Sequence, residues 1–294
     1  MRRGFRHGSF LAGLLAILAL AGCGGGANSA GAGASPSTVK VTPGGQRGAL
    51  ASRGSSTRSV PALIPPAAAP TRSVHVPVLT YHRVAAMPAV GQLDLIVDPA
   101  NFAAELAALN AAGYHTIHQA QLFDALYEGA ALPSRPIIIS VDDGYVDDVR
   151  TILPDLERWH MTATFFVITG RTAEPGFLTF DQIRQLDRAG MDVGDHTTHH
   201  LDLRLLTPSQ LRSETAGSRQ TLDATLGHPV YYFAYPFGAY DDAVLAALHA
   251  AGFTLAYTTA GGTTETTSAP LTMPRIHVGR DETPGGLVSM LGGA

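Results

Sequence analysis

The sequence is poor in the residues that crosslink or charge a protein. Its 294 residues include one cysteine, Cys23, and charged residues make up only 15%. A single cysteine excludes an intramolecular disulfide, so cysteine usage does not report the redox compartment. The formal net charge is -4, and the sequence therefore lacks the overall basic character that nucleic-acid binding requires. We expect no nucleic-acid partner.

Long apolar runs are also scarce, and the one near the N-terminus is short. Arg2, Arg3 and Arg6 precede the run FLAGLLAILALAG, which leads directly to Cys23. A membrane-spanning helix needs roughly 20 apolar residues, whereas this layout is typical of a bacterial export signal. The ending LAGC resembles the lipobox of bacterial lipoproteins. We expect residues 1–22 to be a lipoprotein signal peptide and Cys23 to carry the lipid; a cleaved ordinary signal peptide is the alternative.

Acidic residues are absent from the next segment. Between Gly24 and Arg72 the chain consists mainly of Gly, Ala, Ser, Pro and Thr, with five basic residues and no acidic one. This composition cannot bury enough apolar surface to fold. We expect residues 23–73 to be a flexible tether between the lipid and a folded domain, residues 74–294. The protein would then be extracytoplasmic, anchored to a bacterial membrane in the periplasm or at the cell surface.

The folded part contains a recurring junction between a helix and a strand. The stretches NAAGYHTI, RAGMDVG and HAAGFTLA each end an apolar-periodic segment with glycine, at Gly113, Gly190 and Gly252, and continue into a strand-like run. Glycine readily closes a helix in the left-handed conformation. Alternating helices and strands predict a parallel sheet with helices outside, either a barrel or a doubly wound sheet.

The same patterns give approximate element positions. We expect helices over residues 98–109, 146–159, 179–189, 208–226 and 241–251. We expect strands near residues 76–81, 137–141, 163–168, 191–194, 231–234, 254–257 and 275–278.

Reactive side chains follow several of these predicted strands. Asp142 and Asp143 follow IIISV, and a cluster of three histidines, His196, His199 and His200, follows MDVG. In parallel α/β folds the catalytic groups lie at the carboxyl ends of the strands. One carboxylate and two imidazoles can hold Zn²⁺, Co²⁺, Ni²⁺ or Fe²⁺ with positions left open. Such a cation would favour two ionised carboxylates side by side, one ligating and the other acting on water.

Four motifs together resemble those of one enzyme family. VLTYHRV, SVDDGY, GDHTTHHLDL and FAYPFGAYDD run across Pro77 to Val278 in the order found in the polysaccharide deacetylase family, the NodB-homology domain of carbohydrate esterase family 4. The Tyr-His segment and FAYPxG resemble the subgroup that deacetylates poly-N-acetylglucosamine in bacterial biofilms. The resemblance implies a distorted (β/α) barrel with about seven parallel strands and hydrolysis that depends on a divalent metal, most simply Zn²⁺.

The resemblance also assigns roles to single residues. It implies that Asp143, His196 and His200 bind the metal, and that Asp142 is the general base for the attacking water. His199 would replace His200 as ligand if the register differed. The metal and a backbone N–H, that of Phe237, would hold the oxyanion.

The general acid has two candidates. The resemblance places His82 in this role, as in the subgroup with an N-terminal Tyr-His segment, and we favour it over His277, which matches the position of the acid in other branches. Many members of the family also carry an arginine that tethers the base, but this chain has Ala234 at that position. Another group must therefore orient Asp142.

The expected substrate is an acetylated glycan polymer. We favour poly-β-1,6-N-acetylglucosamine, with peptidoglycan or chitooligosaccharides as other N-acetylated candidates, and expect Tyr145 and Tyr235 to contact the sugar. Two other functions use the same sequence features. One is an O-acetyl esterase on xylan or another acetylated glycan, and the other is a non-catalytic glycan-binding lipoprotein.

Overall fold

A computed structural model of the chain describes residues 62–68, 70–86 and 93–292. The expected signal peptide, Cys23 and most of the expected tether lie outside these residues. Within the described ranges, no helix has both the length and the apolar character needed to cross a membrane.

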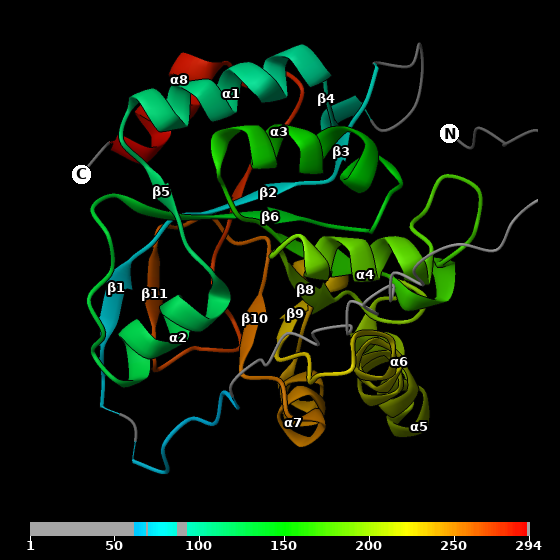
Figure 1. Cartoon of the computed structure of the whole chain (residues 1–294). Coiled ribbons are helices and arrows are strands. Elements are labelled where there is room, and N and C mark those ends of the chain that lie inside the picture. The colour runs from blue at the N-terminus through cyan, green and yellow to red at the C-terminus, as the bar shows by residue number, and fades with distance from the viewer. Residues whose placement is uncertain (1–61, 69, 87–92, 293–294) are drawn as a thin grey trace, which may run out of the picture. The chain divides into compact units, whose positions relative to one another are not determined.

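A curved parallel sheet organises the domain (Figure 1). Its strands, in spatial order, are β10 (Leu255–Tyr257), β9 (Tyr232–Ala234), β8 (Asp192–Asp195), β7 (Thr164–Val167), β6 (Pro136–Val141), β2 (Val78–Tyr81) and β12 (Ile276–His277). All neighbours on this path pair in parallel, and β5 (His115–Thr116) pairs in parallel with the start of β6.

The two edges of the sheet approach each other through the segment before β12. Met273 N donates to Ala256 O and Thr258 N donates to Met273 O, each over 2.9 Å, which attaches this segment to β10. The chain then continues into β12, which pairs with β2. The result is a distorted (β/α) barrel with seven parallel strands on its main path, and the fold predicted from the sequence is confirmed.

Helices cover the outside of the sheet. They are α1 (Pro99–Ala111), α2 (Gln119–Tyr127), α3 (Leu153–Trp159), α4 (Phe180–Arg188), α5 (Pro208–Arg212), α6 (Ser218–Leu226), α7 (Asp242–Ala251) and α8 (Pro284–Gly292). Two π-helical turns, η2 (Asp148–Ile152) and η5 (Ser213–Gly217), precede α3 and α6. The junctions expected from the sequence are present: Gly190 and Gly252 adopt left-handed φ values of 86° and 83°, and each leads into a strand of the sheet.

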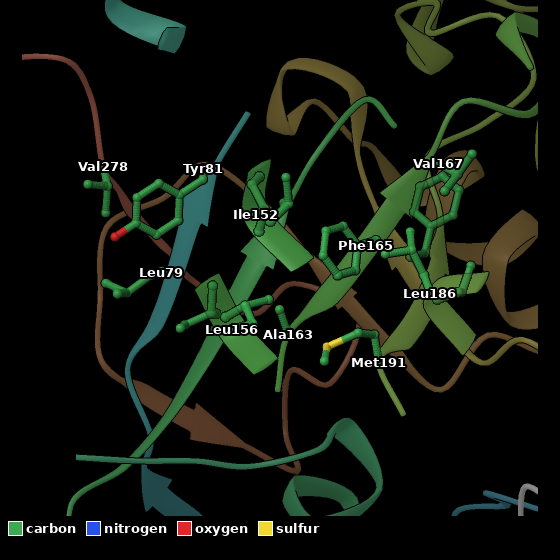
Figure 2. Packing of buried hydrophobic residues seen from close by; sticks show 14 of the residues in the cluster. Leu79, Tyr81, Ile152, Leu156, Ala163, Phe165, Val167, Leu186, Met191 and Val278 are labelled. Atoms are coloured by element: carbon green, nitrogen blue, oxygen red, sulfur yellow. The ribbon is translucent and has the colours of Figure 1, made fainter. Parts of the chain in front are cut away.

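The strands are buried on both faces. In β2 and β7 the outward residues Leu79, Tyr81, Phe165 and Val167 pack under the helices, where Figure 2 shows them beside Ile152 and other apolar residues of the same cluster. Alternate residues point into the barrel, because successive side chains of a strand face opposite ways. The same alternation along β6 turns Ser140, and after it Asp142, toward the barrel interior.

The end of the expected tether packs on the domain. Leu63 is only 2% exposed, within a cluster of residues that includes the inward side of the strands. Arg72 donates through Nη1 to Leu126 O over 2.9 Å, at the end of α2. β1 (Ser73–His75) then pairs antiparallel with β11 (Thr264–Thr266). The described residues before the expected boundary at residue 74 therefore also pack on the domain.

Candidate active site

A pocket of about 470 Å³ opens at the carboxyl ends of the strands. All site residues predicted from the sequence within the described ranges line it: His82, Asp142, Asp143, Tyr145, His196, His200, Tyr235, Phe237 and His277. They come from loops after β2, β6, β8 and β9 and from β12. The parallel topology brings these motifs together although they are up to two hundred positions apart.

Asp143, His196 and His200 form a compact donor set. Asp143 Oδ1 lies 3.6 Å from His196 Nε2 and 3.7 Å from His200 Nε2, and one ligand atom from each residue fits within 4.8 Å of the others. Two zinc–ligand bonds of about 2.1 Å at a tetrahedral angle separate their donor atoms by about 3.4 Å. The spacing is thus close to that of a metal site with three protein ligands.

The surroundings of His196 also fit a metal ligand. Its Nδ1 lies 2.7 Å from the carbonyl oxygen of Ala234, which makes Nδ1 the protonated nitrogen and leaves the lone pair of Nε2 directed at the donor set. Burial lowers the pKa of His196 to about 3, so the ring is neutral at physiological pH and free to ligate. These residues therefore fit a divalent cation.

Arg275 is the residue that orients Asp142. Its Nη1 and Nη2 donate to the two carboxylate oxygens of Asp142, each over 2.8 Å, and its Nε donates to Thr258 O over 3.1 Å. Both side chains are nearly inaccessible, at 2% and 3%. Sequence reasoning missed this residue, although Arg275 stands two positions before His277. It fills the role left open by Ala234.

The pKa values of the two adjacent carboxylates are shifted in opposite directions. Burial alone would raise the pKa of Asp142, but the Arg275 guanidinium outweighs it and holds that pKa well below its usual range. For Asp143, burial and the negative charge of Asp142 outweigh the opposing charge of Arg171 and raise the pKa to about 7. Asp142 is therefore ionised at neutral pH, whereas Asp143 without a bound cation is partly protonated there.

The raised pKa of Asp143 predicts how metal affinity depends on pH. A cation binds only the ionised carboxylate, so the proton competes with it below pH 7. Since His196 is neutral throughout this range, we expect the association constant for zinc to fall about tenfold between pH 8 and pH 6. Titration against a competing chelator measures this. An association constant that does not change over this range would contradict the raised pKa of Asp143. Asp143→Asn is the control, since this variant should bind zinc weakly at both pH values.

Both candidate acids are present at one side of the pocket. The rings of His82 and His277 lie 5.7 Å apart, edge to face. Burial lowers the pKa of His82 to about 4, although the charge of Asp142 opposes that shift, and its Nδ1 has no hydrogen-bond partner among the described residues. His277 is exposed, and its Nε2 lies 3.2 Å from the carbonyl oxygen of Asp94. His82 is thus the deeper of the two.

The aromatic residues differ in their access to a glycan. Phe237 is 65% exposed at the mouth of the pocket, and its ring lies against that of His200. Tyr145 is half-buried and stacks on Phe177. Tyr235 is buried, and its hydroxyl donates to Leu271 O over 2.8 Å. The ring of Tyr235 therefore forms part of the pocket wall, and its expected contact with the sugar stays a prediction.

His199 lies outside the donor set. Its Nδ1 is 2.6 Å from Glu214 Oε1, and its side chain does not line the pocket. The alternative register, with His199 as a metal ligand, is not supported by this geometry.

Comparison with known proteins agrees with the fold. The polysaccharide deacetylase family profile matches residues 129–256. YxkH of Bacillus subtilis, a protein named for the same family, is 28% identical over 203 residues, which are 69% of this chain and 71% of YxkH. Fold and site together define a polysaccharide deacetylase domain.

Solved structures extend the match over most of the described residues. The deacetylase PplD of Streptococcus pyogenes superposes with a TM-score of 0.70 at 27% identity, over 75% of this chain and 99% of PplD. IcaB of Ammonifex degensii, at 24% identity, shares the fold with a TM-score of 0.65 over 74% of this chain and 97% of its own. Both structures share the fold of the polysaccharide deacetylase domain that the family profile matches at residues 129–256.

Proposed function

We propose that the protein is a zinc-dependent N-deacetylase of an N-acetylglucosamine polymer, with poly-β-1,6-N-acetylglucosamine as the favoured substrate. The proposal rests on two features of one pocket. Asp143, His196 and His200 form a set of possible metal ligands, and beside it lies the carboxylate of Asp142, held by Arg275. The PplD structure is described as a complex with acetate, which is the product that this reaction would release.

Asp142 is suited to accept the proton of the attacking water. The bidentate contact with Arg275 holds the carboxylate of Asp142 in one orientation, so the base does not have to be oriented during the reaction. Asp143, His196 and His200 would hold the zinc ion, which when bound supplies a Lewis acid that polarises the acetyl carbonyl and makes water more acidic. Because its pKa is depressed, Asp142 is ionised across the neutral range and has a free lone pair to accept the proton.

The leaving amine needs a proton donor, and the developing oxyanion needs a hydrogen-bond donor. His82, deep in the pocket, is the proposed donor to the amine nitrogen. Burial lowers its pKa to about 4, and the charge of Asp142 opposes this shift only in part. The proposed oxyanion donor is the backbone N–H of Phe237, in the turn Tyr235–Gly238. Phe237 has a left-handed φ of 59°, a strained conformation that an active site can retain when its surroundings hold it.

A substitution at Gly238 tests this turn. Gly238 has a φ of 66°, and a Cβ there would overlap the backbone nitrogen and the hydroxyl of Thr259. We expect Gly238→Ala to displace the turn and lower kcat about 10–100-fold with zinc affinity unchanged. This is less than the decrease in kcat of about 10²–10³ caused by complete removal of an oxyanion donor, because the displaced turn keeps its N–H. Gly261→Ala is the matched control, because a Cβ there meets no atom within 4 Å. Equal activity of the two variants would exclude a role for this turn.

The substrate proposal rests on the Tyr-His and FAYPxG motifs and is tested by acetate release. Purified protein is assayed with β-1,6-linked and β-1,4-linked N-acetylglucosamine oligomers, peptidoglycan and acetylated xylan, each with Zn²⁺, Co²⁺, Ni²⁺ or Fe²⁺. We expect the fastest release from the β-1,6 oligomers. Release from xylan alone would identify an O-acetyl esterase, and glycan binding without release under any metal would identify a non-catalytic binding protein.

We also propose that the enzyme works at the cell envelope as a lipoprotein. The support is the sequence LAGC at Cys23 after a charged and then apolar start. Labelling with a radioactive fatty acid in a bacterial host should modify the native chain and leave Cys23→Ser unlabelled, and label on that variant would contradict the proposal.

A further inference from the structure

The loop that carries both histidine ligands has an unusual backbone. It runs from Asp195 to His200, and within it Thr197 and His200 have left-handed φ values of 70° and 56°. Residues other than glycine rarely adopt this conformation because Cβ crowds the backbone. The loop therefore needs contacts from outside itself to keep this shape.

Glu214 makes two of these contacts through its side chain. Its Oε2 accepts from His199 N over 2.8 Å, and its Oε1 lies 2.6 Å from His199 Nδ1. The side chain of Glu214 is only 5% exposed, so both carboxylate oxygens are committed to one residue of the loop. Burying a carboxylate is unfavourable unless it is well hydrogen-bonded, and His199 supplies these bonds.

A second anchor holds the start of the loop. Asp195 Oδ1 accepts from Thr197 N over 2.7 Å and from Ser218 Oγ over 2.9 Å. Asp195 is fully buried, so these hydrogen bonds lie in the protein interior. Glu214 and Ser218 both belong to the segment formed by η5 and α6.

The position of Glu214 on a π-helical turn is informative. The turn, Ser213–Gly217, interrupts the helical run between α5 and α6. Such turns occur frequently at functional sites. The π-helical turn lies beside the metal-binding loop, and its Glu214 hydrogen-bonds His199, the residue directly before His200.

We propose that Glu214 is a positioning residue for the metal site. It fixes His199, and thereby the loop, in the conformation that directs His196 and His200 toward Asp143 before a metal arrives. The inference rests on the proposed metal-dependent function. It predicts a specific loss of metal affinity, because a loop released from Glu214 must be reordered when the ion binds.

Glu214→Gln tests the proposal without any substrate. The amide can accept only one of the two hydrogen bonds, and we expect zinc affinity to fall about 10–100-fold, as is typical when groups that orient metal ligands are changed. Zinc competition with a chromogenic chelator measures affinity, and the visible absorption of the Co²⁺ form reports ligand geometry. Glu157→Gln is the matched control, since Glu157 is exposed on α3 and its replacement should leave both measurements unchanged.

His199→Ala keeps the test decisive if Glu214→Gln does not fold. Its ring is 62% exposed, and its loss leaves the backbone bond to Glu214 in place. We expect zinc affinity to fall at least threefold but less than in a folded Glu214→Gln. Wild-type affinity in every folded variant of the two would overturn the proposal. Failure of the wild-type protein to bind any divalent metal would instead refute the proposed function.

Discussion

Asp142→Asn should reduce acetate release from the preferred oligomer by about 10²–10⁴-fold, the range expected for loss of a general base. The amide cannot accept the proton of the attacking water, whereas the three metal-binding residues are untouched. Zinc affinity should therefore remain near that of the wild-type protein, and the loss should appear in kcat. Steady-state kinetics with a coupled acetate assay, beside a zinc titration of the same sample, measure both quantities.

Asp143→Asn is the control for this prediction. The two substitutions are chemically identical and one position apart, but Asp143→Asn should weaken zinc binding and Asp142→Asn should not. A folded, zinc-loaded Asp142→Asn with activity within tenfold of wild type would show that another group takes the proton. Equal losses of zinc affinity in both variants would show that the two aspartates share one role.

Arg275→Met should lower the free energy of unfolding at pH 7 by about 3–5 kcal/mol, the usual result of removing one partner from a buried ion pair. Asp142 would stay in the barrel as an uncompensated charge, since Arg275 supplies both of its shortest contacts. Activity should fall as well, because burial would then raise the pKa of Asp142 and leave its carboxylate unoriented. Urea denaturation measures the first effect.

The double variant Arg275→Met/Asp142→Asn isolates the pair. If the buried charge causes the destabilisation, removing it should restore part of the stability lost in Arg275→Met. The deficit of Arg275→Met should also shrink in acid. Arg275 depresses the pKa of folded Asp142, so this stabilisation is fully present above the unfolded pKa of about 3.9 and is lost as pH falls below it. A deficit unchanged in the double variant and in acid would assign it to packing of the Arg275 side chain.

Local patterns were sufficient to predict a parallel sheet covered by helices, and the resemblance to the deacetylase family was needed to choose the barrel. Glycine after an apolar-periodic segment marked the helix–strand junctions at Gly190 and Gly252, and apolar runs marked the strands. The sequence did not reveal α8, which contains two glycines in its first turn. Leu287 and Leu291 are buried in the main apolar cluster, so tertiary packing stabilises a helix that propensity disfavours.

Proximity in sequence decided which parts of the site could be predicted. The metal-binding residues stand in short motifs at strand ends, and the topology brings these ends together. Arg275 was missed because its partner Asp142 is 133 positions away, and no local pattern reports such a contact. Two-residue periodicity offered a clue, since it places Arg275 on the same strand face as His277, a residue already suspected of facing the pocket.

The packing of residues before position 74 on the domain could not be predicted for a related reason. Residues 62–73 have the composition of a linker, and composition records how much apolar surface a segment can bury but not whether a folded neighbour is available. Leu63 and Arg72 obtain their partners from the domain itself.

The burial of the Asp142–Arg275 pair bears on how substrate enters the pocket and how product leaves it. It lies beside the reaction centre with almost no solvent contact, and the barrel below it is filled by packed side chains. The pocket is thus a blind end, so acetate must leave through the mouth by which the glycan enters. A chain seated across that mouth would trap the product, and each turnover would require the polymer to shift or dissociate. Acetate itself should then compete with the glycan for the free enzyme.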